Sequence, residues 1–272
     1  MRITFLVMRG PFLSAMFTTL PHPIIFAHRG ASAHAPENTL AAFELAIEQG
    51  ADGIELDAKL SADGQVVVIH DATVDRTTGA HGRVKDMSLT ELHSLDAGGF
   101  FSEKFKNEKI PTLEEVFETV GKRTFINVEL TNYNTPRDHL VESVCILVKK
   151  FGMQKRVLFS SFLPLNLSNA RNYLPDVPTG LLALDGVLGL WSRSFGFAFG
   201  KYDALHPNIR NVTQQQIYFV HRLKRRIRVW TVNEEADLRR LFKWGVDAVF
   251  TDDPQLAVKV RGEKAEDGIN PV

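Results

Sequence analysis

The sequence contains little cysteine and no excess of charge, and each shortage excludes a class of protein. Cys145 is the only cysteine among the 272 residues, so no disulfide can form within the chain. It lies in an apolar stretch, where we expect an inert buried thiol rather than a nucleophile. Lys plus Arg and Asp plus Glu both number 32, which leaves no overall basic field to attract nucleic acid. We therefore expect no nucleic-acid partner, and nothing points away from a cytoplasmic location.

Long hydrophobic runs are also missing. The apolar segment Ile3–Val7 is interrupted at residues 9–11, far short of the roughly 20 apolar residues that a membrane span needs. A secretory signal needs a longer apolar run and a small-residue cleavage site, for which Ser14–Met16 is a poor match. We expect residues 1–22 to form a loose extension, with a weak signal peptide as the alternative, and residues 261–272 to fray. No stable membrane insertion is expected.

Short β-branched or aromatic runs alternate with longer segments of helical period, and this rhythm predicts the fold. The strand-like runs are Ile24–Ala27, Gly53–Ala58, Thr124–Leu130, Val157–Ser160, Thr179–Leu182, Ala204–His206, Arg228–Val232 and Ala248–Thr251. The helix-like segments are Thr39–Gln49, Leu113–Val120, Arg137–Phe151, Leu163–Tyr173, Thr213–Leu223, Glu234–Trp244 and Pro254–Val260. Eight strands alternating with helices over about 250 residues predict an α/β fold, the (β/α)8 or TIM barrel.

An open, doubly wound sheet is the alternative fold, but its glycine-rich fingerprint is absent. The residues after the first strand, His28–Ser32, do not match G-x-G-x-x-G. We therefore predict one catalytic domain over residues 23–260. The rhythm breaks once, where a short strand at Gln65–Ile69 precedes a polar, glycine-rich segment in place of the second helix. That segment, about residues 71–110, is predicted to be an insertion over one mouth of the barrel.

Three carboxylates lie at the ends of neighbouring predicted strands. Glu55 and Asp57 are two apart in one strand, so their side chains point to the same side. Glu129 ends the next barrel strand and reaches the same rim. Adjacent buried carboxylates repel each other unless a positive group lies between them, and hard divalent cations prefer oxygen ligands. We predict that these three residues bind one divalent cation.

Two histidines and an arginine reach the same rim. His28 ends the first strand, and His70 follows the extra strand. Histidine transfers protons near neutral pH, whereas Arg29 presents a fork of donors that suits phosphate. A cation site, a pair of proton-transfer groups and a phosphate ligand together predict hydrolysis of a phosphate ester.

Other rim residues allow two interpretations. Trp230 ends the seventh strand, as either core filler or an apolar wall for a small alcohol. His206 ends the sixth strand, where it either lines the site or is structural. Asp71 is expected to orient His70 or the loop backbone. Glu37 is explained by helix capping, because it precedes Asn38 and Thr39 at a predicted helix start.

The segments that carry these residues resemble the glycerophosphodiester phosphodiesterase family over about residues 24 to 260. The matching segments are His28-Arg29-Gly30, Pro36-Glu37-Asn38-Thr39, Gly50–Asp57, Asp63–Asp71, Arg76–Gly79, Ile110–Leu113, Asn127–Leu130, Ser161-Phe162, His206-Pro207, Trp230–Asn233, Gly245–Asp247 and Thr251-Asp252. The resemblance implies a TIM barrel that hydrolyses small-molecule glycerophosphodiesters to glycerol 3-phosphate and an alcohol.

The resemblance also assigns roles. It implies that His28 and His70 are the acid/base pair and that Arg29 contacts phosphate. It further implies that Glu55, Asp57 and Glu129 are the ligands of Mg²⁺ or Ca²⁺, while Trp230 and His206 remain candidate substrate contacts. The chain departs from the family at Thr131, where members often carry lysine two residues after the third carboxylate. Phosphate binding is therefore expected to depend more on Arg29 and the cation.

Two competing functions stay open at this point. One is a lysophospholipase D or sphingomyelinase-like barrel that uses the same histidines and cation on a lipid. Six aromatic residues would receive its acyl chain, although the last four of them are expected to pack as helix core: Phe100, Phe101, Trp191, Phe195, Phe197 and Phe199. The other is a non-catalytic barrel that binds a phosphodiester, which the presence of both histidines and all three carboxylates opposes.

Overall fold

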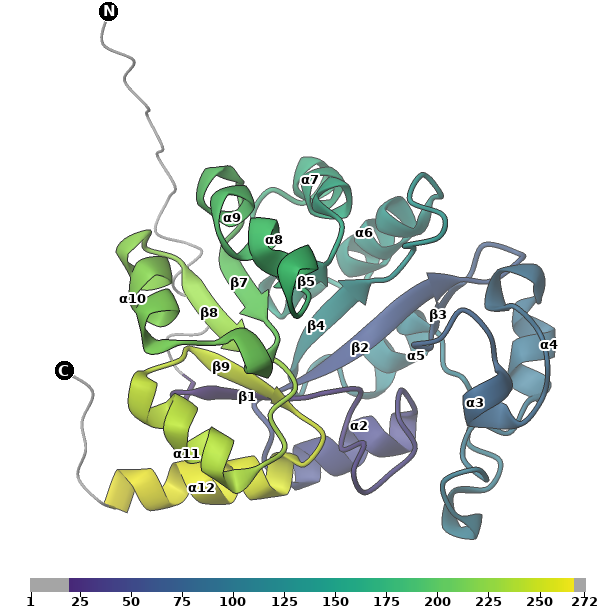
Figure 1. Ribbon diagram of the computed structural model, residues 1–272. Coiled ribbons are helices and arrows are strands. Elements are labelled where there is room, and N and C mark those ends of the chain that lie inside the picture. The colour runs from purple at the N-terminus through teal and green to yellow at the C-terminus, as the bar shows by residue number, and fades with distance from the viewer. Residues whose placement is uncertain (1–19, 267–272) are drawn as a thin grey trace, which may run out of the picture.

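The computed structural model describes residues 20–266, which form a closed barrel of eight parallel strands with helices around it (Figure 1). The barrel strands are β1 (Ile24–Ala27), β2 (Gly53–Leu60), β4 (Phe125–Leu130), β5 (Val157–Ser161), β6 (Thr179–Ala183), β7 (Ala204–Pro207), β8 (Arg226–Val229) and β9 (Ala248–Thr251). β1 pairs with both β2 and β9, which closes the ring. The predicted (β/α)8 fold is confirmed.

Helices follow the strands and cover the outside of the barrel (Figure 1). They are α2 (Leu40–Glu48), α5 (Leu113–Thr119), α6 (Leu140–Lys150), α7 (Pro164–Tyr173), α10 (Gln214–Arg222), α11 (Glu235–Trp244) and α12 (Pro254–Glu266). Two short helices, α8 (Leu190–Arg193) and α9 (Phe195–Phe199), follow β6. Single 3₁₀ turns occur at η3 (Met153–Lys155), η4 (Val187–Gly189) and η5 (Ile209–Asn211).

Local start and stop signals explain several helix ends. The Thr112 hydroxyl accepts from the backbone N–H of Glu115, whose carboxylate accepts in return from the Thr112 backbone, so α5 begins with a capping box. Gly245 ends α11 in the left-handed region at φ 81°. Asn233 lies one residue before the N-cap of α11, Glu234, and its side chain bonds to Asp252.

Strand alternation separates the polar interior of the barrel mouth from the apolar layer beneath the helices. Ile54 and Leu56 of β2 are fully buried in the main hydrophobic core that the helices cover. Glu55 lies between these two residues in the sequence and Asp57 follows Leu56, so the side chains of Glu55 and Asp57 point to the opposite side, the barrel interior. The lower interior is filled by a second apolar cluster, made of Ile24, Phe26, Leu158, Ala248 and Phe250. The barrel is therefore closed below and polar at its carboxyl end.

The insertion expected between the second strand and its helix is a small unit with its own core. It contains β3 (Val66–Val68), α3 (Asp75–Thr78), η1 (Val84–Asp86), α4 (Leu89–Ser94) and η2 (Glu103–Phe105). β3 pairs antiparallel with the end of β2, which extends the sheet beyond the barrel. Its core residues are Val67, Ile69, Val74, Val84, Leu92, Ala97 and Ile110. This unit carries His70 beside the barrel mouth.

The carboxyl-terminal helix extends further than the sequence indicated. α12 continues to Glu266, whereas a frayed tail was expected from Arg261. Arg261 is instead held by an ion pair with Asp52 and a bond to the Pro23 carbonyl, at 3.0 Å, so this turn of helix is fastened to the barrel. Most of the predicted N-terminal extension lies outside the described residues. Within residues 20–266, no helix has the length and apolar character needed to cross a bilayer.

The close packing of β6 on β7 gives a stability prediction. A Cβ on Gly180 would lie 2.2 Å from Nε2 of the buried His206 ring, so only glycine leaves room for it. We expect Gly180→Ala to lower the free energy of unfolding by about 1–3 kcal/mol, the usual effect of overpacking. Urea unfolding followed by circular dichroism measures this.

The matched control is Gly262→Ala, because a Cβ there would meet nothing within 4 Å and the residue lies in α12. Alanine in a helix favours folding, so this variant should be as stable as the parent or more so. An unchanged urea midpoint for Gly180→Ala would contradict the packing argument.

Candidate active site

The ends of the barrel strands surround a cavity of about 170 Å³. Its lining residues are His28, Arg29, Glu55, His70, Asn127, Glu129, Ser160, Phe162, Leu182, His206, Trp230 and Phe250. Seven of the eight residues singled out in the sequence line this cavity, and the eighth, Asp57, lies against them in the carboxylate cluster. The structure thus brings together residues at the carboxyl ends of β1, β2, β4, β7 and β8 and one residue of the insertion.

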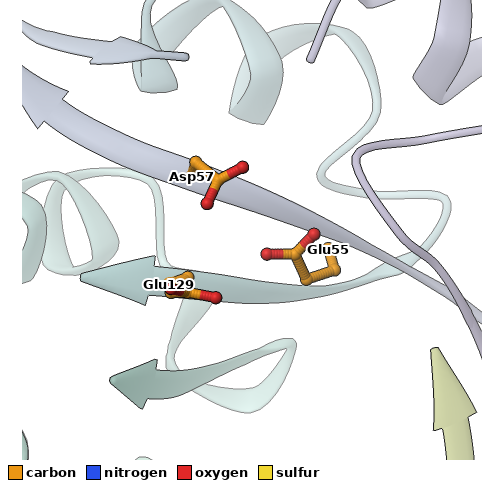
Figure 2. Close-up of side chains that lie close together, drawn as sticks. All are labelled: Glu55, Asp57 and Glu129. Atoms are coloured by element: carbon orange, nitrogen blue, oxygen red, sulfur yellow. The ribbon is translucent and has the colours of Figure 1, made fainter. Parts of the chain in front are cut away.

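The three carboxylates converge from two adjacent strands (Figure 2). β2 supplies Glu55 and Asp57, and β4 supplies Glu129, which is paired in register with Asp57. One carboxylate oxygen from each lies within 4.8 Å of the others. Glu55 and Asp57 are only 3% and 1% exposed. Three acidic groups this close and this buried form a strongly unfavourable arrangement unless positive charge compensates them.

The protein supplies part of that compensation. Arg29 donates its backbone N–H to Glu55 Oε2 at 3.0 Å, and its Nε lies 3.3 Å from Asp57 Oδ2. Asn38 also donates to Asp57 Oδ2, at 2.9 Å, and Tyr133 Oη donates to Glu129 Oε1 at 2.6 Å. Glu55 Oε1 is buried and has no hydrogen-bond partner among the described residues. Compensation is therefore incomplete at the centre of the cluster.

The pKa values of the cluster show the same imbalance. Burial and the neighbouring carboxylate of Asp57 raise the pKa of Glu129 to about 8. Burial, Asp57 and Glu129 together raise the pKa of Glu55 well above its ordinary value. Burial also opposes ionisation of Asp57, but Arg29 and the histidines outweigh it and lower the pKa of Asp57. The surroundings therefore favour loss of the proton from Asp57 and oppose it at Glu55 and Glu129.

His28 is held from the last strand of the barrel. Its Nδ1 lies 2.7 Å from Oδ1 of Asp252, just beyond β9, and Ser32 and Asn233 donate to the same carboxylate. This bond fixes the ring and directs the Nδ1 proton to Asp252, while Nε2 stays outside this contact. Asp252 is 224 residues away in sequence, and the sequence analysis matched it to the family without giving it a role.

His70 is held within the insertion. Its Nδ1 lies 2.7 Å from Oδ1 of Asp71, whose other oxygen accepts from Arg76 Nε at 2.7 Å. Burial opposes ionisation of Asp71, but Arg76 and His70 lower its pKa to about 2. Of the two roles considered for Asp71, orientation of His70 is the one that the contacts support. Both histidines thus have a carboxylate on Nδ1.

Glu37 joins the insertion to the barrel, and capping alone does not explain it. Its Oε1 and Oε2 accept from Arg76, both at 2.7 Å, and Oε1 also accepts from Arg29 at 3.0 Å. An unbroken chain of charged contacts therefore runs from Asp71 through Arg76, Glu37 and Arg29 to the carboxylate cluster. The sequence signal for Glu37 was only its position near the rim.

Trp230 and His206 form the far wall and floor of the cavity. Trp230 packs edge-on against Phe162 at 5.7 Å, and its indole N–H donates to the His206 carbonyl at 2.7 Å. His206 is fully buried, and burial together with Arg228 holds its pKa well below the ordinary value. Its Nε2 lies 3.2 Å from Arg228 Nη1. The ring is therefore neutral and does not exchange protons near pH 7.

The side chain of Lys59 contacts Thr131, the position at which family members often carry a lysine. Lys59 of β2 directs its Nζ to Thr131, with 2.8 Å to the hydroxyl and 3.2 Å to the carbonyl oxygen. Lys59 follows Asp57 by two residues and so shares its face of the strand, a signal that the sequence carries but that did not lead to a predicted role. The absence of a lysine at position 131 therefore does not leave that corner of the site without positive charge.

Comparisons with known proteins agree with this geometry. The model of the glycerophosphoryl diester phosphodiesterase family matches residues 28–256. A glycerophosphodiester phosphodiesterase of Caldanaerobacter subterraneus is 40% identical over 238 residues, or 87% of this chain and 97% of that protein. One of Bacillus altitudinis is 38% identical over 245 residues, or 88% of this chain and 98% of that protein.

Solved structures share the fold. An Oleispira antarctica phosphodiesterase in complex with the product sn-glycerol-3-phosphate has a TM-score of 0.81 and 31% identity, over 88% of this chain and 96% of that one. A glycerophosphodiester phosphodiesterase of Agrobacterium tumefaciens has a TM-score of 0.74 and 32% identity, over 87% of this chain and 99% of that one. The chain therefore belongs to the glycerophosphoryl diester phosphodiesterase family.

Proposed function

We propose that this enzyme hydrolyses glycerophosphodiesters to glycerol 3-phosphate and an alcohol, using His28 and His70 for proton transfer beside one divalent cation. One observation carries the proposal. Two histidines, each with a carboxylate on Nδ1, line the same cavity as a buried cluster of three carboxylates. The named relatives and the neighbour that holds sn-glycerol-3-phosphate support this choice of substrate.

The residues present fit a divalent cation. Glu55, Asp57 and Glu129 offer only oxygen ligands, which hard ions such as Mg²⁺ and Ca²⁺ prefer. The buried Glu55 Oε1 has no partner among the described residues, and the raised pKa values of Glu55 and Glu129 show where positive charge is missing. When bound, such an ion lowers the pKa of a coordinated hydroxyl and offsets charge that develops on phosphate oxygens.

Proton transfer is assigned to the two histidines. One takes the proton from the glycerol hydroxyl next to the ester, and that oxygen attacks phosphorus. The other protonates the oxygen of the departing alcohol as its bond to phosphorus breaks. The cyclic glycerol phosphate then opens by attack of water, with the two histidines exchanging roles. Asp252 and Asp71 hold each ring by Nδ1, so that Nε2 makes these transfers.

The remaining rim residues position the substrate. Arg29 presents a guanidinium to the phosphate while it stays anchored on Asp57 and Glu37. The indole of Trp230 provides an apolar surface for the carbon atoms of glycerol. His206, kept neutral beneath it, contributes shape and holds the indole through its carbonyl oxygen.

The assignment of the histidines predicts large losses of activity. His28→Ala and His70→Ala should each lower kcat by roughly 10²–10⁴, the usual effect of removing a positioned acid or base. Release of glycerol 3-phosphate from glycerophosphocholine measures kcat. His139→Ala, whose side chain is 85% exposed away from the cavity, is the control and should retain full activity. Near-parental kcat in either cavity variant would disprove the role of that histidine.

The carboxylate cluster predicts that cation affinity depends on pH. Glu129 must lose its proton to bind a cation, and its pKa without the ion is about 8. The apparent affinity for Mg²⁺ or Ca²⁺ should therefore rise with pH by at least about tenfold per unit below pH 8, and more steeply where Glu55, whose pKa is also raised, must lose a proton too. Isothermal titration calorimetry of the EDTA-treated protein at pH 6, 7, 8 and 9 measures the affinity.

Proton release provides the control for this experiment. Titration in two buffers of different ionisation enthalpy should show protons leaving on binding at pH 7, and Glu129→Gln should bind the ion more weakly with a flatter pH dependence. Glycerol 3-phosphate release should stop with EDTA and return with the ion that serves. Release that continues in EDTA would contradict the cation proposal.

A lysolipid substrate is the second candidate, because one observation favours it. Trp191, Phe195 and Phe199, which the sequence analysis expected to be helix core, are 57%, 71% and 83% exposed, and only Phe197 is buried. Trp191 lies on α8, which follows the carboxyl end of β6 and is bonded there through Arg193 to the Leu184 and Gly186 carbonyls. Phe195 and Phe199 lie on α9, which leads to the start of β7 and whose Phe197 carbonyl accepts from Arg225, just before β8 (Figure 1). Only Trp191 therefore stands at the cavity end of the barrel, where an exposed aromatic side chain suits an acyl chain.

Direct comparison of two substrates distinguishes the candidates. We expect a higher kcat/KM for glycerophosphocholine than for lysophosphatidylcholine, because a cavity of about 170 Å³ is too small to enclose a long acyl chain as well. The variant Trp191→Ser serves as control and should leave turnover of glycerophosphocholine unchanged. Equal turnover of the two substrates by the parent enzyme, with loss of only the lipid activity in Trp191→Ser, would establish the lipid function instead.

A further inference from the structure

Lys59 is the third inward-facing residue at the end of β2, after Glu55 and Asp57. The register pairs Glu55 with Asn127 and Asp57 with Glu129, and Ala58 with Leu130. One residue further along both strands, the same register places Lys59 opposite Thr131. This pair follows Asp57 and Glu129 by two residues, and so lies one layer of side chains nearer the barrel mouth than the carboxylates. The contacts of Lys59 with Thr131 agree with this placement.

The ammonium group of Lys59 is fixed but not neutralised by contact with an acid. Nζ donates to the hydroxyl and carbonyl oxygens of Thr131 at 2.8 and 3.2 Å, and that hydroxyl donates in turn to the Ala58 carbonyl at 2.7 Å. Among residues 20–266 no carboxylate forms an ion pair with Nζ, and its third N–H has no hydrogen-bond partner. A half-buried cation with a free donor is a ready-made anion ligand.

We propose that Lys59 binds an anionic oxygen of the substrate phosphate and so takes the part that a lysine at position 131 would play. This inference rests on the proposed function and deepens it by adding a substrate-binding residue.

The charges of the site support the proposal. Three carboxylates are balanced by one divalent ion together with Arg29, and Arg29 is further engaged by Glu37. These groups leave no excess positive charge with which to attract a phosphodiester, which carries one negative charge. Lys59, nearer the barrel mouth, adds a positive charge that no carboxylate among residues 20–266 engages in an ion pair. At short range in a partly buried site this attraction is substantial.

A merely structural lysine makes a different prediction. If Lys59 only offsets repulsion among the carboxylates, its removal should strengthen cation binding and leave phosphate affinity unchanged once the cation is saturating. If it binds phosphate, its removal should weaken the substrate and glycerol 3-phosphate at saturating cation. The two roles therefore separate in one set of measurements.

The test uses Lys59→Gln, Thr131→Val and the exchange variant Lys59→Gln/Thr131→Lys. At saturating Mg²⁺ or Ca²⁺ we expect Lys59→Gln to raise both KM and the dissociation constant of glycerol 3-phosphate by about 10- to 100-fold, the effect of losing a charged hydrogen bond. Thr131→Val, which keeps the size of the side chain and removes the anchor, should raise both by a smaller factor. The exchange variant should recover most of the affinity, because it returns an ammonium to the same layer from β4.

Binding is measured by calorimetry, which needs no turnover, and KM by glycerol 3-phosphate release. Failure of the parent enzyme to release glycerol 3-phosphate would reject the proposed function, while calorimetry with glycerol 3-phosphate still tests Lys59. Parental affinity in both Lys59→Gln and Thr131→Val, with tighter cation binding in the former, would overturn the proposal and make Lys59 structural. If Lys59→Gln does not fold, the result with Thr131→Val decides.

Discussion

The repulsion among Glu55, Asp57 and Glu129 is the constraint on which the active-site end of this barrel depends. Three carboxylates within 4.8 Å, two of them almost wholly buried, are tolerated only because their surroundings are arranged to receive them. The fixed register of β2 with β4 holds the backbone of all three residues in place, so the sheet already brings their side chains together without a further loss of backbone conformational entropy. The repulsion that the protein leaves uncompensated at Glu55 and Glu129 would strengthen binding of the proposed cation, because such an ion would relieve a repulsion that folding has already imposed.

The turn after β1 shows how the fold meets this constraint locally. Arg29 has φ 56°, an uncommon value for a residue with a side chain, and this lets its backbone N–H reach Glu55 while its guanidinium reaches Asp57. Gly30 follows at φ 83°, and a Cβ there would lie 2.6 Å from that of Ala42 on α2. The close approach of α2 thus fixes the turn, and the strained arginine is held because it contacts two of the three carboxylates.

Sequence reasoning succeeded where the signal is periodic and local. Alternation of strands and helices predicted the barrel, and the i, i+2 spacing of Glu55 and Asp57 predicted a shared carboxylate face. It failed to give a role to Asp252, because nothing local marks a partner 224 residues from His28. It also misplaced the ends of elements, as at Arg261, and the exposure of Trp191, since apolar character alone does not show whether a helix is covered. Lys59 was missed although the same alternation that revealed Asp57 included it.

The two histidines differ in how they are supported, because one is held by the barrel and the other by the insertion. His28 is held within the barrel through Asp252, at the end of β9. His70 belongs to a unit with its own hydrophobic core, so its position relative to His28 depends on how that unit is joined to the barrel. β3 connects the insertion to the barrel through backbone pairing with β2. At the cavity, Arg76 of the insertion donates to Glu37, which also accepts from Arg29. The Arg29 guanidinium, which partly balances the carboxylates, therefore also contacts Glu37, the residue that connects the insertion and its His70 to the barrel. Charge compensation and alignment of the two histidines are in this way one network, which explains why so many charged side chains converge on so small a cavity.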